Sequence, residues 1–393
     1  MGGGGAGTTD HRGGIEDELH RIHAAGLHRS LHRAGRPLKA EIVLDGRRII
    51  NFSSNDSLGL ATDRRLSAAV QDALVRYGVG SGASRLVSGN MHPHEELECK
   101  AASYLEREKA LLFNSGYQAN IGAIPALAGR DCTILSDELN HASLIDGIRL
   151  ARAECRIYPH NDTSKLRRLL IEAPADHEVL VVTESLFSME GDRSRLEEIV
   201  ALKGTRPFML YLDEAHALGA TGPSGRGLAA ETGCADSVDV VLGTLGKAFG
   251  ASGAFVAARS PIVDLLLNRA RSFIYSTAPM PAVAAAGSAA IDLVRDGRVA
   301  RQRLRHNTER FREAVLEITG CNPPGIDHIV PVFFPGVTRV MKACADLLEL
   351  GIYCQGIRPP TVPAGSCRLR FSISAAHDDE QLDQAAAALG KIL

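Results

Sequence analysis

Seven short apolar segments separated by helical patterns constrain the fold of this 393-residue chain more than any other feature. Each segment is a continuous apolar run, as expected for a strand covered on both faces. A strand with one solvent-exposed face would instead show alternating apolar and polar residues. Strands that alternate with helices predict an α/β fold, in which a mainly parallel sheet of seven strands lies between layers of helices. The expected strands span residues 110–114, 132–136, 154–158, 179–184, 208–212, 238–243 and 254–257.

The segments that flank this sheet predict a second, smaller α+β domain. Residues 41–51 alternate around Asp45-Gly46, a strong short signal for a β-hairpin. A polar, His-rich helix is expected ahead of the hairpin, over about 15–33. An Ala-rich helical region follows Pro281 and extends to about Thr319. Further strands are expected near 328–334, 352–355 and 368–374, with helices between and after them.

We therefore expect four parts along the chain, with the two chain ends meeting in the small domain. The first 14 residues are rich in Gly and Thr, which predicts a disordered tail. An N-terminal arm that joins the small domain comes next, followed by the large domain and the C-terminal α+β domain. The expected boundaries are 1–14, 15–54, 55–285 and 286–393.

Composition and charge exclude several classes of protein. The chain has 44 Lys and Arg against 46 Asp and Glu, and this lack of a basic excess argues against a nucleic-acid-binding protein. No apolar run reaches 18 residues, so no membrane-spanning helix is expected. The eight cysteines are scattered and the N-terminus lacks a signal-peptide pattern, which predicts a cytoplasmic protein with reduced thiols. No metal site is expected, and the N-terminal histidines fit a solvated helix face better (His11, His20, His23, His28 and His32).

An acidic motif directly follows the strand expected at 208–212. Asp213 begins the sequence D-E-A-H at 213–216, and a carboxylate at the carboxyl end of a buried strand lies where open α/β sheets bind ligands. Nucleic-acid helicases carry the same letters, but this chain has no phosphate loop of the type G-x-x-x-x-G-K-[ST]. The motif therefore indicates a carboxylate that binds a small ligand.

Three further motifs follow expected strands and complete a chemical set. Lys247 ends the sequence G-T-L-G-K, and a lysine held at a sheet edge can have a lowered pKa and form a Schiff base with an aldehyde. The sequence N-S-G-Y at 114–117 begins a helix whose free N–H groups can bind phosphate, and His141 follows the next strand. Each residue alone has an ordinary structural explanation. Together, an amine, a phosphate cradle and an aspartate indicate pyridoxal 5′-phosphate (PLP).

The order of these motifs resembles the α-oxoamine synthases, fold-type-I PLP enzymes that condense an amino acid with an acyl-CoA thioester. The resemblance extends from about Leu27 to the C-terminus. It rests on N-F-S-S-N-D-S-L-G-L at 51–60, G-S-G-A-S-R at 80–85, N-S-G-Y-Q-A-N at 114–120, N-H-A-S at 140–143, F-S-M-E-G-D at 187–192, D-E-A-H at 213–216, G-T-L-G-K at 243–247, I-R-P-P-T-V-P at 357–363, R-L-R at 368–370 and S-A-A-H at 374–377.

The resemblance implies a cofactor site in a homodimer with shared active sites. Lys247 would hold PLP and remove the Cα proton, Asp213 would pair with the pyridine nitrogen, and His141 would stack on the ring. His216 would hydrogen-bond the phenolic oxygen of the cofactor. The residues implied to bind the cofactor and its phosphate are Gly116, Tyr117, Ser188 and Thr244, with Ser276 and Thr277 reaching the cofactor of the partner subunit.

The resemblance also implies sites for an amino acid and an acyl thioester. Arg370 would bind the amino-acid carboxylate through two parallel hydrogen bonds, and Asn55 would help to hold this substrate. Arg29 and Thr361 would line the end of the acyl chain, and Arg358 belongs to the same substrate-binding set.

The motif R-P-P-T-V-P at 358–363 most resembles the biotin-pathway members of the family. The expected reaction joins L-alanine to a pimeloyl thioester and yields 8-amino-7-oxononanoate, CoA and CO2. Leu86 counts against a succinyl donor, while Ser57, where relatives usually have tyrosine, leaves another amino acid or acyl chain open. The alternatives are a 2-amino-3-ketobutyrate CoA ligase, a serine palmitoyltransferase-like enzyme or a secondary-metabolite acyltransferase, with CoA or a carrier protein as the thiol.

Two other classes of protein are alternatives to an α-oxoamine synthase. An aminotransferase would use a keto-acid acceptor and release no CoA. A non-catalytic PLP-binding regulator or partner subunit is disfavoured, because a dead subunit would be expected to lack the lysine at position 247.

Overall fold

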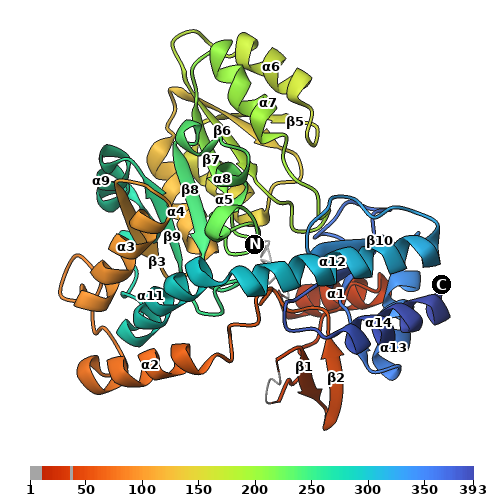
Figure 1. Ribbon diagram of the computed structural model, residues 1–393. Coiled ribbons are helices and arrows are strands. Elements are labelled where there is room, and N and C mark those ends of the chain that lie inside the picture. The colour runs from red at the N-terminus through yellow and green to blue at the C-terminus, as the bar shows by residue number, and fades with distance from the viewer. Residues whose placement is uncertain (1–10, 36–38) are drawn as a thin grey trace, which may run out of the picture.

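The computed structural model describes residues 11–35 and 39–393, and a single sheet of seven strands lies at the centre of its larger part (Figure 1). The strands follow the order β3-β9-β8-β7-β6-β4-β5 across the sheet. β9 is antiparallel to both of its neighbours, whereas the other neighbouring pairs are parallel. The α/β class and the mainly parallel sheet are thereby confirmed. The strands are β3 (Lys109–Phe113), β4 (Cys132–Asp137), β5 (Glu154–Tyr158), β6 (Glu178–Glu184), β7 (Met209–Asp213), β8 (Val240–Thr244) and β9 (Ala254–Ala258).

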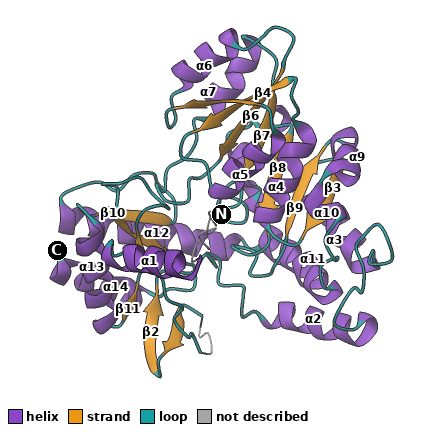
Figure 2. Ribbon diagram, turned by 180° about the vertical axis from the view of Figure 1, so that it is seen from behind, coloured by secondary structure: helices purple, strands orange, loops and turns teal. Residues whose placement is uncertain are grey.

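Successive side chains of the strands enter two separate hydrophobic cores, one on each face of the sheet. On β7, Tyr211 belongs to one core, whereas Leu210 and Leu212 belong to the other. Because both faces are covered, the strands read as continuous apolar runs. One face is covered by α4 (Gly116–Leu127), α5 (Ala142–Ala151), α9 (Ser260–Arg269) and α10 (Arg271–Ile274) (Figure 2). The other is covered by α3 (His92–Tyr104), α6 (Thr163–Glu172), α7 (Leu196–Ala201), α8 (Gly227–Glu231) and α11 (Pro281–Asp296), and α2 (Arg64–Tyr77) packs on α11.

The strand at 154–158 is present, but the prediction that it is covered on both faces is wrong. β5 lies at the edge of the sheet and pairs only with β4. Only Tyr158 of its five residues is buried, and Ile157 is 63% exposed. An edge strand has fewer neighbours to cover it, which explains why charged residues are tolerated there.

Both ends of the chain build the smaller part of the molecule (Figure 1). β1 (Glu41–Leu44) and β2 (Arg47–Asn51) form the predicted hairpin, and its turn residues Asp45 and Gly46 have φ of 48° and 81°, as a type I′ turn requires. β2 pairs in parallel with β11 (Ile352–Tyr353) from the other end of the chain. A second small sheet has the order β10 (Ile329–Phe333), β13 (Arg368–Ser372) and β12 (Gly356–Ile357). The helices of this part are α1 (His11–Ala24), α12 (Arg298–Thr319), α13 (Val337–Glu349) and α14 (Asp379–Ile392).

The first helix differs from the prediction at both ends. It was expected over about 15–33, but α1 begins at His11 and ends at Ala24. The end has a physical cause, because Gly26 adopts a φ of 68° and Leu27 N–H donates to Ile22 O at 3.0 Å. These are the features of a Schellman motif, which terminates a helix with glycine just beyond its last turn. The part of the predicted tail at residues 1–10 lies outside the described residues.

The Ala-rich region after Pro281 forms two helices, because α11 ends at Asp296 and α12 begins at Arg298. These helices continue in succession from the large sheet toward the C-terminal part (Figure 1). The domain boundaries at 54/55 and 285/286 stay a prediction. Short 3-10 helices complete the structure at η1 (Leu202–Gly204), η2 (Pro223–Gly225) and η3 (Ala235–Ser237). Within residues 11–35 and 39–393, no helix is long and apolar enough to cross a membrane.

Candidate active site

Three neighbouring parallel strands end in polar residues at one edge of the large sheet. β6 ends at Glu184, β7 ends at Asp213 and β8 ends at Thr244, and Glu184 is the register partner of Asp213. Carboxyl ends of parallel strands are where open α/β sheets place their ligand sites. Lys247 follows β8 by three residues, so the topology brings the predicted lysine and aspartate to the same edge.

A chain of hydrogen bonds fixes the Asp213 carboxylate relative to the His141 ring. Asn120 Nδ2 donates to Asp213 Oδ2 at 2.9 Å and to Ser143 Oγ at 2.9 Å. Ser143 Oγ lies 2.8 Å from His141 Nδ1, and Tyr211 Oη donates to Asn120 Oδ1 at 2.8 Å. Asn120 is itself buried and is held by Tyr211, a residue of the sheet. The Asp213 carboxylate therefore has one defined orientation. In this orientation, the Asp213 carboxylate can stabilise a proton on a basic ring nitrogen.

Lys247 carries an amine with no partner among the described residues, since no hydrogen bond or ion pair to its Nζ is present there. Burial lowers the pKa of Lys247 to about 8, although the negative charges of Asp213 and Glu184 act in the opposite direction. A large fraction of this amine is therefore neutral near pH 8. A neutral, unpartnered lysine fits the Schiff-base role that the sequence predicts.

The N-terminus of α4 supplies an anion cradle beside the end of β8. Ser115 caps this 12-residue helix and accepts a hydrogen bond from Gln118 N–H, while the N–H groups of Gly116 and Tyr117 have no acceptor in the described structure. A Cβ placed on Gly116 would lie only 3.9 Å from the Thr244 side chain, so the helix start and Thr244 are neighbours. Free N–H groups at a helix N-terminus bind phosphate. The amine, the carboxylate and this cradle together fit PLP.

The second predicted phosphate segment lies next to the start of α4. Asn114 Nδ2 donates to Thr277 O at 3.1 Å, and Thr277 forms an isolated bridge with Ser84. The Tyr117 side chain is 45% exposed, and its hydroxyl donates to Asp146. Thr277 thus contacts the predicted cofactor segment through its main-chain oxygen, which accepts from the Asn114 side chain.

The two predicted histidines are neutral near pH 7. Burial lowers the pKa of His216 well below its ordinary value, and the positive charges of Lys247 and Arg370 act in the same direction. No hydrogen bond to the His216 ring occurs among the described residues, which leaves both of its nitrogens available. Burial also lowers the pKa of His141. The Nδ1 atom of His141 accepts from Ser143 N–H at 3.2 Å.

Arg370, on β13 of the smaller part of the molecule, contacts the loop that follows β6 at the edge of the large sheet. The side chain is 7% exposed, and Nε donates to the main-chain oxygen of Ser188. Nη1 and Nη2 each donate to Asn55 Oδ1 at 3.2 Å, and Nη1 also donates to Ser372 Oγ at 3.0 Å. Burial lowers the pKa of Arg370 to about 10, so the guanidinium keeps its charge near neutral pH. Arg370 is thus in direct contact with two other predicted residues, Asn55 and Ser188.

The remaining predicted substrate residues form a separate group. Arg358 is buried, and its Nη2 donates to His28 O at 2.7 Å, next to Arg29 in the chain. Thr361 N–H donates to Arg358 O at 3.1 Å, and the side chains of Arg29 and Thr361 are exposed. Arg358 therefore holds the segment of Arg29 through internal contacts. No hydrogen bond or ion pair joins this group to Lys247 among the described residues.

Glu184 is a site residue that the sequence analysis missed. It is buried beside Asp213, and its Oε1 accepts from His141 N–H at 2.6 Å. Burial raises the pKa of Glu184 well above its ordinary value, and the neighbouring Asp213 adds to the effect. Both effects favour the neutral form of the Glu184 carboxyl group. Its position at the end of an apolar run, as for Asp213, was the available signal.

The chain belongs to the aminotransferase class I and II family, which matches residues 47–389. Within this family it is an α-oxoamine synthase, and its curated relatives are named 8-amino-7-oxononanoate synthase. The protein of Geobacter sulfurreducens is 47% identical over 96% of this chain and 97% of its own length. That of Geobacter metallireducens is 46% identical with the same coverage.

Solved structures of the same family confirm the fold-type-I architecture. A serine palmitoyltransferase of S. paucimobilis, solved with a bound PLP–myriocin aldimine, shares 29% identity with a TM-score of 0.91 over 96% of each chain. The Sphingomonas wittichii serine palmitoyltransferase shares 30% identity with the same TM-score and coverage. The 8-amino-7-oxononanoate synthase of Francisella tularensis shares 27% identity with a TM-score of 0.76, over 87% of this chain and 97% of its own.

Proposed function

We propose that this protein is a PLP-dependent acyltransferase of biotin biosynthesis that condenses L-alanine with a pimeloyl thioester, giving 8-amino-7-oxononanoate with release of CoA and CO2. Its 47% identity to a relative of that name across almost the whole chain supports this choice of substrates. The observation in the structure that carries the proposal is the half-buried amine of Lys247, which has no partner within the described residues and lies at the same sheet edge as Asp213.

The residues at the sheet edge match each part of the cofactor. PLP, when bound, supplies an aldehyde for amines and a protonated ring that accepts the electron pair left at Cα. The free N–H groups of Gly116 and Tyr117 would hold its phosphate, helped by the hydroxyl of Thr244. Asp213 would keep the ring nitrogen protonated, because a fixed carboxylate stabilises the charged form of a nearby base.

Lys247 would move the proton in the chemical step. Its amine is free of hydrogen bonds in the described structure, and a pKa of about 8 leaves it partly neutral under physiological conditions. A base whose pKa lies near the working pH is suited to take a proton from Cα and to return it later. The neutral His216 and His141 would orient the cofactor, His216 by a hydrogen bond and His141 by packing on the ring.

Arg370 would bind the amino-acid carboxylate. Its guanidinium remains charged, and its position is fixed by Ser188 O and Asn55 Oδ1 before any substrate arrives. Such preorganisation reduces the cost of ordering the substrate. Arg29 and Thr361, whose segments are each joined to Arg358 by a hydrogen bond, would meet the far end of the acyl chain.

We further propose that the enzyme is a homodimer. The loop 79–87 lies against the loop 275–278, because Ala278 N–H donates to Ala83 O at 3.0 Å. Four large apolar side chains on these loops are exposed, and an uncovered patch of this kind marks an interaction surface. They are Val79 (73% exposed), Leu86 (52%), Val87 (79%) and Tyr275 (71%). Thr277 lies on the same loops, which supports its proposed reach to the partner subunit's cofactor.

All eight cysteines are free in the structure. Reduced thiols support a cytoplasmic location, which we propose for this enzyme.

A serine palmitoyltransferase-like activity is the second candidate. The specific observation in its favour is the TM-score of 0.91 to two serine palmitoyltransferases, against 0.76 to the Francisella synthase. The sequence identity favours the first candidate, because it is 47% to a curated 8-amino-7-oxononanoate synthase and 30% to the Sphingomonas enzyme.

Thiol release from an acyl-CoA tests the proposed function directly. PLP-loaded protein is mixed with pimeloyl-CoA and L-alanine, and parallel reactions contain glycine or L-serine, or palmitoyl-CoA as the donor. We expect release only with alanine and pimeloyl-CoA, and none from the Lys247→Ala variant. Release with serine and palmitoyl-CoA would favour the second candidate. Transfer of the amino group to a keto acid without thiol release would contradict both candidates.

A further inference from the structure

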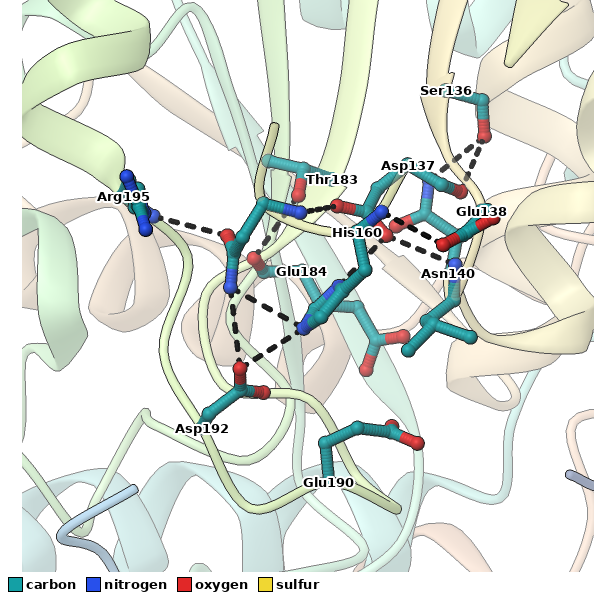
Figure 3. A network of polar contacts seen from close by, with 12 residues as sticks. Ser136, Asp137, Glu138, Asn140, His160, Thr183, Glu184, Glu190, Asp192 and Arg195 are labelled. Carbon is teal, nitrogen blue, oxygen red and sulfur yellow. Dashed lines mark hydrogen bonds and ion pairs between the residues drawn. The ribbon is translucent and has the colours of Figure 1, made fainter. Parts of the chain in front are cut away.

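His160 lies between two carboxylates that come from different segments of the chain (Figure 3). Its Nδ1 is 3.0 Å from Asp137 Oδ1, and its Nε2 is 2.9 Å from Asp192 Oδ2. Asn161 strengthens the same junction, because its N–H donates to Asp137 Oδ2 at 2.9 Å and its Nδ2 donates to Asp192 Oδ2 at 3.2 Å. The ring edge also packs on Phe187 at 4.4 Å between centroids.

The two carboxylates require His160 to be an imidazolium ion. An ionised carboxylate only accepts hydrogen bonds, so both ring nitrogens must donate. Burial favours the neutral ring, but the hydrogen bonds to Asp137 and Asp192 outweigh this effect and raise the pKa of His160 to about 10. The other charged groups in this region make no hydrogen bond to the ring within the described residues. They are Glu138, Glu184, Glu190 and Arg195 (Figure 3).

Asp137 connects this imidazolium to the loop that presents His141. Asp137 ends β4, and its Oδ1 also accepts from Leu139 N–H at 2.9 Å. Glu138 Oε1 accepts from His160 N–H at 2.9 Å, so a side chain of the same loop also holds the main chain of His160. The loop then continues directly to His141, which caps α5.

Asp192 connects the imidazolium to the loop that holds Arg370. Phe187 N–H donates to Asp192 O at 2.9 Å, so the loop 187–192 closes on itself. Ser188 lies on this loop and accepts from Arg370 Nε through its main-chain oxygen. Two residues farther along, Glu190 accepts from Arg368 Nη1 at 2.8 Å. The loop 187–192 therefore supplies one of the acceptors that fix the Arg370 guanidinium, beside those of Asn55 and Ser372.

We propose that His160 is a positioning residue, whose charged ring joins the loop of His141 to the loop of Ser188 and thereby places Arg370 for the amino-acid carboxylate. It acts without touching either substrate. The inference rests on the proposed function, because it assigns the carboxylate to Arg370. It predicts that disruption of the junction weakens amino-acid binding selectively and leaves the acyl thioester site unaffected.

A comparison of His160→Gln with the wild-type holoenzyme tests this inference. We expect KM for alanine to rise about tenfold and KM for pimeloyl-CoA to stay unchanged, because small displacements of a positioning group have large effects. Alanine binding in the absence of thioester, followed by the absorbance of the bound cofactor, should weaken by the same factor. The matched control is His177→Gln. His177 also contacts β4, through Thr133 Oγ1 at 3.0 Å, but at the strand's other end, so this variant should behave as wild type.

The variant Asp192→Asn supplies a second readout, the pH dependence of alanine binding. A purely structural role of His160 would not change this pH dependence. Loss of one carboxylate lowers the pKa of His160 toward its ordinary value, so the ring loses its charge as the pH rises from about 6 to about 9. The ratio of the alanine dissociation constants of variant and wild type should therefore increase with pH. The titrations of Lys247 and of alanine itself cancel in this ratio.

Three results would overturn the inference: an alanine affinity of His160→Gln within about twofold of wild type, an equal loss for both substrates, or a pH-independent ratio for Asp192→Asn. A wild-type enzyme that releases no thiol with alanine contradicts the proposed function instead. The two failures are therefore distinguishable.

Discussion

Glu184 lies in surroundings that favour an uncharged carboxyl group, and a single substitution can test whether the group works without a charge. Burial, together with the nearby Asp213, raises the pKa of Glu184 well above its ordinary value and so favours the neutral form. A glutamine has nearly the same shape and carries no charge. We therefore expect Glu184→Gln to keep kcat within about threefold of wild type, because its amide oxygen can still accept from His141 N–H and the amide matches the favoured neutral form.

Glu184→Ala is the matched comparison, because it removes the acceptor of the His141 N–H group. An unsatisfied buried donor costs about 1–3 kcal/mol, so this variant should lose about tenfold or more in kcat/KM. Steady-state thiol release measures both variants. An equal loss in the glutamine and alanine variants would show that Glu184 works as a carboxylate ion.

The loop after β6 also joins the two parts of the molecule through an ion pair. Arg193 Nε and Nη2 donate to Asp327 at 2.6 and 2.9 Å, and Nη1 donates to Glu231 at 2.8 Å. Asp327 is only 8% exposed. Removal of one partner of a buried pair costs about 3–5 kcal/mol, and Arg193 is partly exposed, so we expect Arg193→Ala to lower the free energy of unfolding by about 2–3 kcal/mol.

Urea unfolding of the cofactor-free protein measures this effect. The control is Arg195→Ala, since the pair of Arg195 with Glu198 is more than half exposed on both sides and should contribute about 0–1 kcal/mol. Equal midpoints for the two variants would contradict the assignment of a structural role to the pair with Asp327.

The elements with a strong local signal are the ones that the sequence predicts well. The seven strands of the large sheet lie within one or two residues of their expected limits. For the strands other than the edge strand β5, the reason is burial on both faces, which produces continuous apolar runs. β12 was not predicted, since a strand of two residues such as Gly356–Ile357 is defined only by its pairing with β13. The end of α1 was predicted nine residues too late, although Gly26 carried the signal.

The candidate site divides in the same way. The location of Lys247 and Asp213 at the same sheet edge was predictable, because each residue lies at or just after the end of a buried strand and belongs to a motif. His160 was not, because its two partners lie 23 and 32 residues away on separate segments and meet it only in the folded chain. The use of Arg358 to hold the main chain of His28, 330 residues away, is likewise a property of the tertiary structure.

The proposed dimer gives the molecule a surface that one charge should disrupt. Val87 is 79% exposed in the apolar patch of the loops 79–87 and 275–278. A glutamate there would have to be buried without a partner in an interface, which is costly. We expect Val87→Glu to shift the protein from dimer to monomer and to lower its activity.

Sedimentation velocity measures the state of association. Val299→Glu is the matched control, because Val299 is 78% exposed but lies on α12, outside the patch. It should remain dimeric. A dimeric Val87→Glu variant, or a monomeric wild type, would contradict the proposed interface.

The pairing of β2 with β11 has a consequence for how a newly made chain reaches its final state. Ile50 leaves the ribosome early, but its partner Ile352 is made about 300 residues later, or roughly 15–60 s at ordinary rates of synthesis. During that time one edge of the hairpin has no strand to pair with. Arg370 is made later still, so a nascent chain already contains the lysine proposed to bind the cofactor while it lacks the group proposed to hold the amino acid. Completion of translation is therefore the event that makes the enzyme competent.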